Sequence, residues 1–188
     1  VGRENLALAD SNAISQFIGQ VQPELIINAA AYTAVDKSEK EPELADAVNR
    51  ISPGIMAKEA KKLGATLIHI STDYVFDGSQ SRPYTETDLT NPLGTYGTSK
   101  LAGEEAIRET EANHIIIRTA WVYGAYGKGN FVKTMLRLGK DREELRVVYD
   151  QVGGQTWTGD LAEAIAQIIP HLNSQTYGTY HYTNSGAI

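Results

Sequence analysis

Three residues have side chains and spacing suited to the reduction of a ketone. Tyr96 and Lys100 are four residues apart in a segment with helical texture, so both side chains are expected on one helical face, one turn apart. Thr72 follows an apolar run earlier in the chain, where its hydroxyl can face the helix that carries Tyr96. Hydride reduction of a ketone needs a donor for the proton that the developing alkoxide takes up, and a positioned tyrosine is such a donor.

The lysine is the group expected to adjust the acidity of the tyrosine. A free tyrosine has a pKa of about 10, and moving this pKa toward 7 requires about 4 kcal/mol of preferential stabilisation of the anion. An ammonium about 4 Å away supplies roughly that amount at an effective dielectric constant of ~20. With ten tyrosines in the chain, Tyr-x-x-x-Lys alone is a weak signal, because a surface tyrosine beside a solvated lysine explains it equally well. The hydroxyl of Thr72, which would orient the carbonyl and share its charge, makes the set coherent.

The elements that must position these residues follow an alternation typical of a parallel sheet wrapped by helices. Polar clusters at residues 28–33, 71–73 and 119–124 follow three of the expected strands, and ligands of open α/β sheets bind at the carboxyl ends of strands. Asp10, Ser11 or Asn12 is expected to cap the first helix, Gly64 to end the second, and Pro53 to kink or break the second. The pattern predicts helices at 14–21, 44–63, 95–108, 130–138 and 158–169, strands at 25–27, 66–70, 115–117 and 145–148, and a loop at 77–92.

Composition excludes several classes of function. The 188 residues are 41% hydrophobic and 21% charged, which is typical of a globular chain and not of a disordered one. There is no cysteine, so disulfides and thiolate chemistry are excluded, and a net charge of −6 disfavours binding to nucleic acid. The apolar runs are too short to cross a membrane and no signal peptide opens the chain, so a cytoplasmic protein is expected.

The remaining ionisable residues do not form a metal site by spacing. The histidines lack the spacing of metal ligands, and His69 lies in an apolar strand, where a satisfied core residue is the simplest interpretation. Glu39, Glu41 and Glu43 are compatible with a bound cation, but a charged entrance to a helix explains them as well. No protein-bound metal is therefore predicted from the residues.

Four segments resemble the extended short-chain dehydrogenase/reductase superfamily, and within it the dTDP-4-dehydrorhamnose reductase family. A fifth segment is similar to the later, substrate-binding part of that family. The resemblance extends over about residues 10–182, with the segments in the same order and at similar spacing. The segments are Asn28–Asp36, Ser71–Phe76, Tyr96–Glu104, Arg118–Tyr123 and Asp150–Ala162.

This resemblance implies a Rossmann-type, doubly wound parallel sheet with a small C-terminal substrate-binding part. It implies reduction of the C4 ketone of a dTDP-linked deoxyhexulose by NADPH or NADH, with Thr72, Tyr96 and Lys100 as the catalytic residues. It also allows a magnesium ion and a homodimer. By the same resemblance the dinucleotide is bound by Ala31, Tyr32, Thr33, Tyr96 and Lys100, and the nucleotide sugar by Thr72, Asp73 and Trp121.

Some alternatives stay open at the level of sequence. A non-catalytic regulatory subunit of the same fold can keep the three catalytic residues, and an epimerase or dehydratase shares the tyrosine and the lysine. A dehydratase normally has a carboxylate pair beside the strand-end threonine, whereas Thr72-Asp73 is followed here by Tyr74, which favours a reductase. Trp121 is either a substrate contact or a core residue, and Asn49 either steadies the backbone near the site or lies on a helix surface.

The chain departs from the family pattern in three places. No Gly-x-x-Gly-x-x-Gly turn precedes Asp10, the position of Ala7 lacks the acidic residue found near the adenine in relatives, and the end at residue 188 is early for the family. We therefore expect a longer native protein whose first strand and last elements are missing here. Within this chain, residues 1–148 are expected to bind the dinucleotide, and residues 149–188 to be part of the substrate-binding region.

Overall fold

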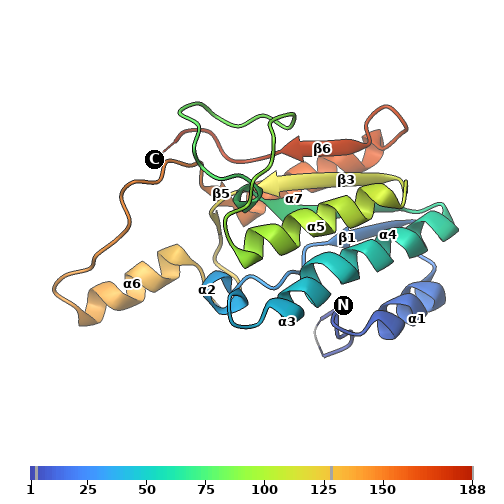
Figure 1. Cartoon of the computed structure of the whole chain (residues 1–188), viewed down its shortest axis with the longest axis horizontal. Helices are drawn as coiled ribbons and strands as arrows, with labels where there is room; N and C mark the ends of the chain where they lie inside the picture. The colour runs from blue at the N-terminus through green and yellow to red at the C-terminus, as the bar shows by residue number, and fades with distance from the viewer. Residues whose placement is uncertain (3, 128, 188) are drawn as a thin grey trace. The chain divides into compact units, whose positions relative to one another are not determined.

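The computed structural model describes residues 1–2, 4–127 and 129–187 (Figure 1). The described residues form two compact units, one within residues 1–118 and 173–181 and one within residues 119–172 and 182–187. Residue 188, the last of the expected substrate-binding region, lies outside the described residues. The boundary expected between residues 148 and 149 stays a prediction.

The first unit is built on a four-stranded sheet in the order β1-β2-β3-β6. β1 pairs in parallel with β2, and β3 pairs in parallel with β6. The alternation of elements in the sequence therefore correctly predicted an α/β fold with a parallel sheet. The strands are β1 (Leu25–Asn28), β2 (Thr66–Thr72), β3 (His114–Thr119) and β6 (Gly178–His181).

Three helices of the first unit supply the apolar side chains that cover this sheet. Figure 1 shows α4 and α5 side by side in front of the strands, with α1 next to α4. Asp10 caps α1 as expected, because its carboxylate accepts hydrogen bonds from the N–H groups of Asn12 and Ala13. Ile14 and Ile18 of α1 pack with Leu67 of β2 in one buried cluster. The helices are α1 (Ser11–Val21), α4 (Ser52–Leu63) and α5 (Thr95–Glu109).

The helical stretch before β2 runs without a gap from Pro42 to Leu63, but its hydrogen-bonding pattern changes just before Pro53, where a kink or a break is expected. It consists of α3 (Pro42–Asp46), a π-helical turn (Ala47–Ile51) and α4, which ends at Gly64 with a φ of 67°. Proline has no N–H, so the carbonyl of Asn49 loses its helical donor. That carbonyl lies instead against Gly103 of α5, where a Cβ atom would overlap it. The π turn therefore brings α5 close to the backbone of Asn49.

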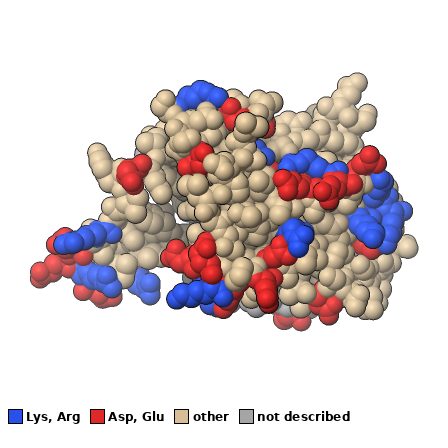
Figure 2. Space-filling model, viewed as in Figure 1, with Lys and Arg blue, Asp and Glu red and all other residues tan. Residues whose placement is uncertain are grey.

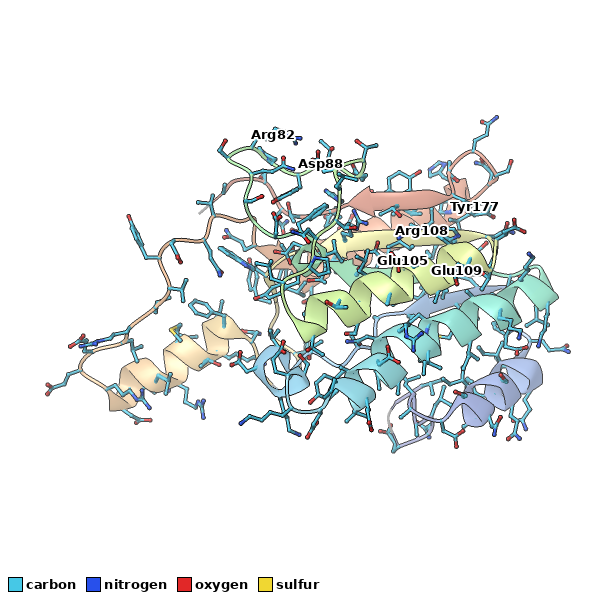
Figure 3. The ribbon with its side chains drawn as sticks, viewed as in Figure 1. Arg82, Asp88, Glu105, Arg108, Glu109 and Tyr177 are labelled. Atoms are coloured by element: carbon cyan, nitrogen blue, oxygen red, sulfur yellow. The ribbon has the colours of Figure 1, made fainter. Side chains whose placement is uncertain are left out.

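The expected loop at residues 77–92 is ordered by two carboxylates. Asp77 accepts hydrogen bonds from Ser79, Tyr84 and Asn91. Asp88 forms a bidentate ion pair with Arg82, with N–O distances of 2.7 and 2.8 Å (Figure 3). These bonds hold the pKa values of both carboxyl groups well below their ordinary range. The 3-10 turn Asp73–Val75 directly precedes this loop, and the first unit also contains the short helix α2 (Val35–Ser38).

The second unit has a small parallel sheet and two helices. Asn130 caps α6 by accepting a hydrogen bond from the N–H of Lys133. The strand expected at residues 145–148 is wrong: the segment is irregular, and Val147 and Val148 are exposed with no partner strand among the described residues. No helix of the described chain is long and apolar enough to cross a membrane. The elements are β4 (Val122–Tyr123), α6 (Phe131–Asp141), β5 (Thr156–Trp157), α7 (Thr158–Ile168) and a 3-10 turn (Ile169–His171).

Candidate active site

α5 carries Tyr96 and Lys100 one turn apart, as the spacing predicts. The helix approaches the 3-10 turn after β2 closely, because Gly97 lies against the carbonyl of Tyr74 and a Cβ atom there would overlap it. The rings of Tyr74 and Tyr96 meet edge to face with centroids 5.5 Å apart. The absence of a side chain at residue 97 therefore allows Tyr96 to lie beside the end of β2.

Thr72 and Asp73 lie at the carboxyl end of β2, beside Tyr96. The hydroxyl of Thr72 donates to the carboxylate of Asp73 at 3.1 Å and accepts from the N–H of Tyr74 at 3.2 Å. Burial raises the pKa of Asp73, and the Thr72 hydroxyl opposes that shift. The structure thus brings Thr72, Asp73 and Tyr96 together within one unit.

The acidity of Tyr96 differs from the sequence-based expectation. Burial raises the pKa of the phenol, the Thr72 hydroxyl lowers it, and the charge of Asp73 raises it further. The expected lowering by Lys100 is absent, because the amine of Lys100 is engaged elsewhere. A raised pKa keeps the proton on Tyr96 at neutral pH, and this is the state in which a phenol can donate a proton.

Lys100 is almost completely buried, with 2% of its surface exposed. Its Nζ donates to the carbonyl of Ile70 at 2.7 Å and lies 3.1 Å from Nε2 of His69. Burial lowers the pKa of Lys100 to about 8, and the charge of Glu104 acts in the opposite direction. His69 is a satisfied core residue, as the sequence suggests, but its contact with Lys100 was not predicted.

The loop after β1 contains the residues expected to bind the dinucleotide. The N–H of Tyr32 donates to Oδ1 of Asn49 at 2.8 Å, and Nδ2 of Asn49 donates to the Tyr32 carbonyl and to the hydroxyl of Ser99. Asn49 is buried, so the view that it steadies the backbone is confirmed. The phenol of Tyr32 donates to Glu41, which leaves the backbone and the small side chain of Ala31 to face a ligand.

A buried ion pair lies one turn further along α5. The carboxylate of Glu104 accepts from Ser71 at 2.5 Å and from two nitrogens of Arg118, Nε at 3.0 Å and Nη2 at 2.7 Å. Burial acts to raise the pKa of Glu104, but the bonds and charge of Arg118 hold it below its ordinary value. Both residues occur in segments that resemble the superfamily, yet no sequence signal gave them a role.

Trp121 belongs to the second unit. It has a φ of 45°, and its side chain is 36% exposed with the indole against Gly153. Within its unit Trp121 is therefore partly exposed and not a fully buried core residue. A bulky residue in left-handed backbone is a strained arrangement, and such strain is typical of functional positions. The expected role of Trp121 in sugar binding stays a prediction.

Two of the three carboxylates considered for a cation, those of Glu39 and Glu41, have protein partners. Glu39 accepts hydrogen bonds from the N–H and the hydroxyl of Thr95, the first residue of α5, and Glu41 pairs with Lys37 at 2.8 Å. Among the described residues no group of three or more histidines and acids could hold a metal ion. Figure 2 shows basic and acidic side chains intermixed over the visible face.

A hollow of about 450 Å³ lies beside the N-terminal half of α5. Its lining includes Glu39, Asp46 and Ser99 but none of Thr72, Asp73, Tyr96 or Lys100. We therefore place the candidate active site at the carboxyl ends of β1 and β2 and not in this hollow.

Comparison with known proteins assigns the arrangement to a family. A family model described as the RmlD substrate binding domain matches residues 1–188. The chain belongs to this family.

Named relatives of the family support the same assignment. The chain is 49% identical over 181 residues to a dTDP-4-dehydrorhamnose reductase of Escherichia coli, covering 95% of the chain and 60% of that protein. It is 45% identical over 184 residues to the spore coat polysaccharide biosynthesis protein SpsK of Bacillus subtilis, covering 98% of the chain and 63% of that protein. The crystal structure of a Bacillus anthracis dTDP-4-dehydrorhamnose reductase with NADP is 42% identical and superposes with a TM-score of 0.92, covering 100% of the chain and 65% of that one.

The chain thus spans 60–65% of the length of these three relatives. Their α/β architecture agrees with the Rossmann-type fold implied by the resemblance, and the superposition confirms that fold for the described chain. The family match does not itself assign roles to single residues.

Proposed function

We propose that this chain carries the catalytic residues of an NADPH- or NADH-dependent reductase that converts dTDP-4-dehydro-L-rhamnose into dTDP-L-rhamnose. The observation that carries the proposal is the placement of Tyr96 beside Thr72 at the end of β2, with Lys100 one turn away on α5. The names of the relatives support the substrate, and the NADP in the Bacillus anthracis structure supports the cofactor.

The residues at the sheet edge fit a bound dinucleotide. Ala29 and Ala30 of the loop after β1 are exposed and carry only methyl side chains, so a ligand can approach the backbone there. Ala31, Tyr32 and Thr33 continue this loop and would line the cofactor. The amine of Lys100 would contact its ribose beside Tyr96. When bound, the reduced cofactor supplies the hydride for C4 of the sugar.

The protein's own residues hold the carbonyl and supply the proton. The hydroxyl of Thr72 orients O4 of the substrate and shares the charge that develops on it. Tyr96 donates its phenolic proton to O4, which completes the hydroxyl group as the C4–H bond forms. Asp73 and Trp121 would contact the nucleotide sugar. The products are the alcohol, the oxidised cofactor and a tyrosinate that regains its proton from solvent.

The decisive experiment is turnover of dTDP-4-dehydro-L-rhamnose by the full-length protein, followed by the loss of NADPH absorbance. Tyr96→Phe removes the proton donor and keeps the ring, so turnover should fall by about two orders of magnitude or more. Tyr180→Phe is the matched control, because the Tyr180 hydroxyl donates to the carbonyl of Thr176 near the start of β6, away from Thr72 and Lys100. A wild-type protein without turnover would favour the regulatory subunit, and an active Tyr96→Phe protein would remove Tyr96 from its role.

A further inference from the structure

A line of buried polar groups connects Lys100 to the loop after β1. Nζ of Lys100 is 3.1 Å from Nε2 of His69, and Nδ1 of His69 is 3.0 Å from Nδ2 of Asn28. Oδ1 of Asn28 accepts a hydrogen bond from the N–H of Ala30 at 3.2 Å. Lys100, His69 and Asn28 are all at most 4% exposed, so water does not supply alternative partners.

The donors and acceptors of this line fit only one protonation state. The Ala30 N–H fixes the carbonyl oxygen of the Asn28 amide, so its NH₂ group faces His69 and Nδ1 of the imidazole must accept. A neutral imidazole then carries its proton on Nε2, which points at Nζ of Lys100. The nitrogen of Lys100 can accept a hydrogen bond from this Nε2–H only as a neutral amine, which has a lone pair. In this arrangement Lys100 is therefore uncharged and donates to the Ile70 carbonyl.

A charged Lys100 requires the opposite arrangement. An ammonium has no lone pair, so Nε2 of His69 must accept from it and the imidazole proton must move to Nδ1. The Nδ1–H group would then face the NH₂ group of Asn28, donor against donor, unless the Asn28 amide flipped by 180°. The turned amide accepts from His69, but its NH₂ group then faces the N–H of Ala30 and their hydrogen bond is lost. Each protonation state of Lys100 thus has its own orientation of Asn28.

We propose that the charge on Lys100 is coupled, through the tautomer of His69 and the amide of Asn28, to the backbone N–H of Ala30. His69 and Asn28 are positioning residues, since they act on the site through Lys100 and the loop. The catalytic meaning of this coupling rests on the proposed function, because the loop after β1 is the segment expected to line the dinucleotide. Binding at the loop and protonation of Lys100 would then affect one another reciprocally.

The surroundings of Lys100 place this change in an accessible pH range. Burial lowers the pKa of Lys100 to about 8, so its charge changes near physiological pH. Burial and the charge of Lys100 hold the pKa of His69 far below its ordinary value, so the imidazole stays neutral and only its tautomer changes. The lysine is thus the group that titrates, and the histidine transmits the change.

The other charged groups around α5 have partners of their own. Glu104, one turn along α5, favours the charged lysine but is paired with Arg118 of β3. Asp73 of the turn after β2 acts on Tyr96. Arg50 of the π turn pairs with Asp46, and Lys61 and Lys62 of α4 pair with Glu111 and Glu59 at the surface.

The first test reads the tautomer of His69 directly in the full-length protein without substrate. Nitrogen-15 NMR of labelled histidine distinguishes Nε2–H from Nδ1–H, and labelled lysine reports the titration of Lys100. The expected result is Nε2–H above a pH of about 8 and Nδ1–H below it, with both signals changing together. A single tautomer on both sides of the Lys100 titration would overturn the proposal.

The second test forces one of the two states. In Asn28→Asp a carboxylate replaces the amide and can accept from both Ala30 and Nδ1–H of His69, so the Nδ1–H tautomer should persist at every pH. The pKa of Lys100 should rise by about 1 pH unit, the lower end of the effect of a nearby opposite charge. Asn113→Asp, at an exposed position before β3, is the matched control and should change neither signal. An unchanged lysine titration in a folded Asn28→Asp protein would contradict the coupling.

These measurements do not depend on catalysis. If the protein shows the coupled titration but no turnover of the sugar nucleotide, the proposed function fails and the coupling stands. If it turns over the substrate while His69 keeps one tautomer throughout, the coupling fails and the proposed function stands.

Discussion

Two successive contacts join β2 to α5, and they differ in how completely their charges are compensated. His69 and Ser71 point to the same face of β2, because side chains two residues apart on a strand do so. They meet Lys100 and Glu104, which are one turn apart on α5. The first contact continues to Asn28 of β1 and holds one ionisable amine without a carboxylate bonded to it. The second continues to Arg118 of β3 and holds a bonded ion pair.

The contact of Glu104 with Ser71 and Arg118 is fixed, because its charges compensate each other. The contact of Lys100 with His69 is adjustable, because the charge of the lysine can change with pH. Glu104 and Arg118 have opposite charges, so their ionised states support one another despite burial. Lys100 is opposed by burial and stabilised only at longer range by Glu104, so its pKa lies within the working range of an enzyme. The ion pair should therefore set the stability of the helix–sheet contact, while the lysine should set the response of the site to pH.

The largest expected effect comes from breaking the ion pair. Glu104→Gln keeps the shape of the side chain but leaves the charge of Arg118 buried without a counter-ion. Breaking one side of a buried pair costs about 3–5 kcal/mol, so the free energy of unfolding should fall by that amount. Urea unfolding of the full-length protein at neutral pH measures it. A loss below about 1 kcal/mol would show that the pair does not hold the helix.

The second effect is a dependence of stability on pH at the adjustable contact. The folded pKa of Lys100 is about 8, below the ordinary value of 10.5, so the unfolded chain binds more protons between these pH values. Stability therefore rises with pH across this window and is reduced below it. The free energy of unfolding of the wild type, relative to Lys100→Met, should increase by of order 3 kcal/mol from about pH 7 to 10.5. If the difference in unfolding free energy between the two proteins did not change with pH, Lys100 would have the same pKa in the folded and unfolded states. Its amine would then be hydrated in the folded protein.

Two glycines of α5 allow these contacts to form and should respond differently. Gly97→Ala and Gly103→Ala introduce a Cβ that overlaps the carbonyls of Tyr74 and Asn49, and each should lower stability by about 1–3 kcal/mol. Gly97→Ala should reduce turnover the more strongly, because it displaces the turn directly beside Tyr96, whereas Gly103→Ala acts on the loop after β1 only through Asn49. Gly139→Ala in α6 meets no neighbouring atom and should stabilise the chain by about 0.5–1 kcal/mol. Thermal unfolding and the turnover assay together separate the three variants.

The sequence predicted the first of the two contacts only in part and the second not at all. Tyr96 and Lys100 are recognisable because their spacing repeats the helical turn, and Thr72 because it ends an apolar strand. Asn28, His69, Glu104 and Arg118 meet only when β1, β2, β3 and α5 come together. A buried histidine or glutamate looks like any other polar residue until its partner, far away in the chain, is known.

The same limit applies to the elements of the fold. Pro53 and Gly64 have local effects on the backbone, so an irregularity near the start of α4 and the end of α4 could be predicted. The strand expected at residues 145–148 rested on Leu145, Val147 and Val148 alone, and a strand forms only where a neighbouring strand accepts its hydrogen bonds. β4, β5 and β6 were missed because they are short and owe their structure to pairing.

The smallest expected effect tests whether burial makes the Glu104–Arg118 ion pair more stabilising than the Glu104–Arg108 ion pair, which has the same charges. Arg108 also contacts Glu104, at 3.2 Å, but its side chain is 38% exposed. Figure 3 shows Arg108 on the outer surface of α5 with Glu105 and Glu109 near it. Solvent therefore screens its interaction with Glu104. Arg108→Gln should therefore lower the free energy of unfolding by at most about 1 kcal/mol, and less at high salt. A loss as large as that of Glu104→Gln would mean that Arg108, not Arg118, is the main counter-ion of Glu104.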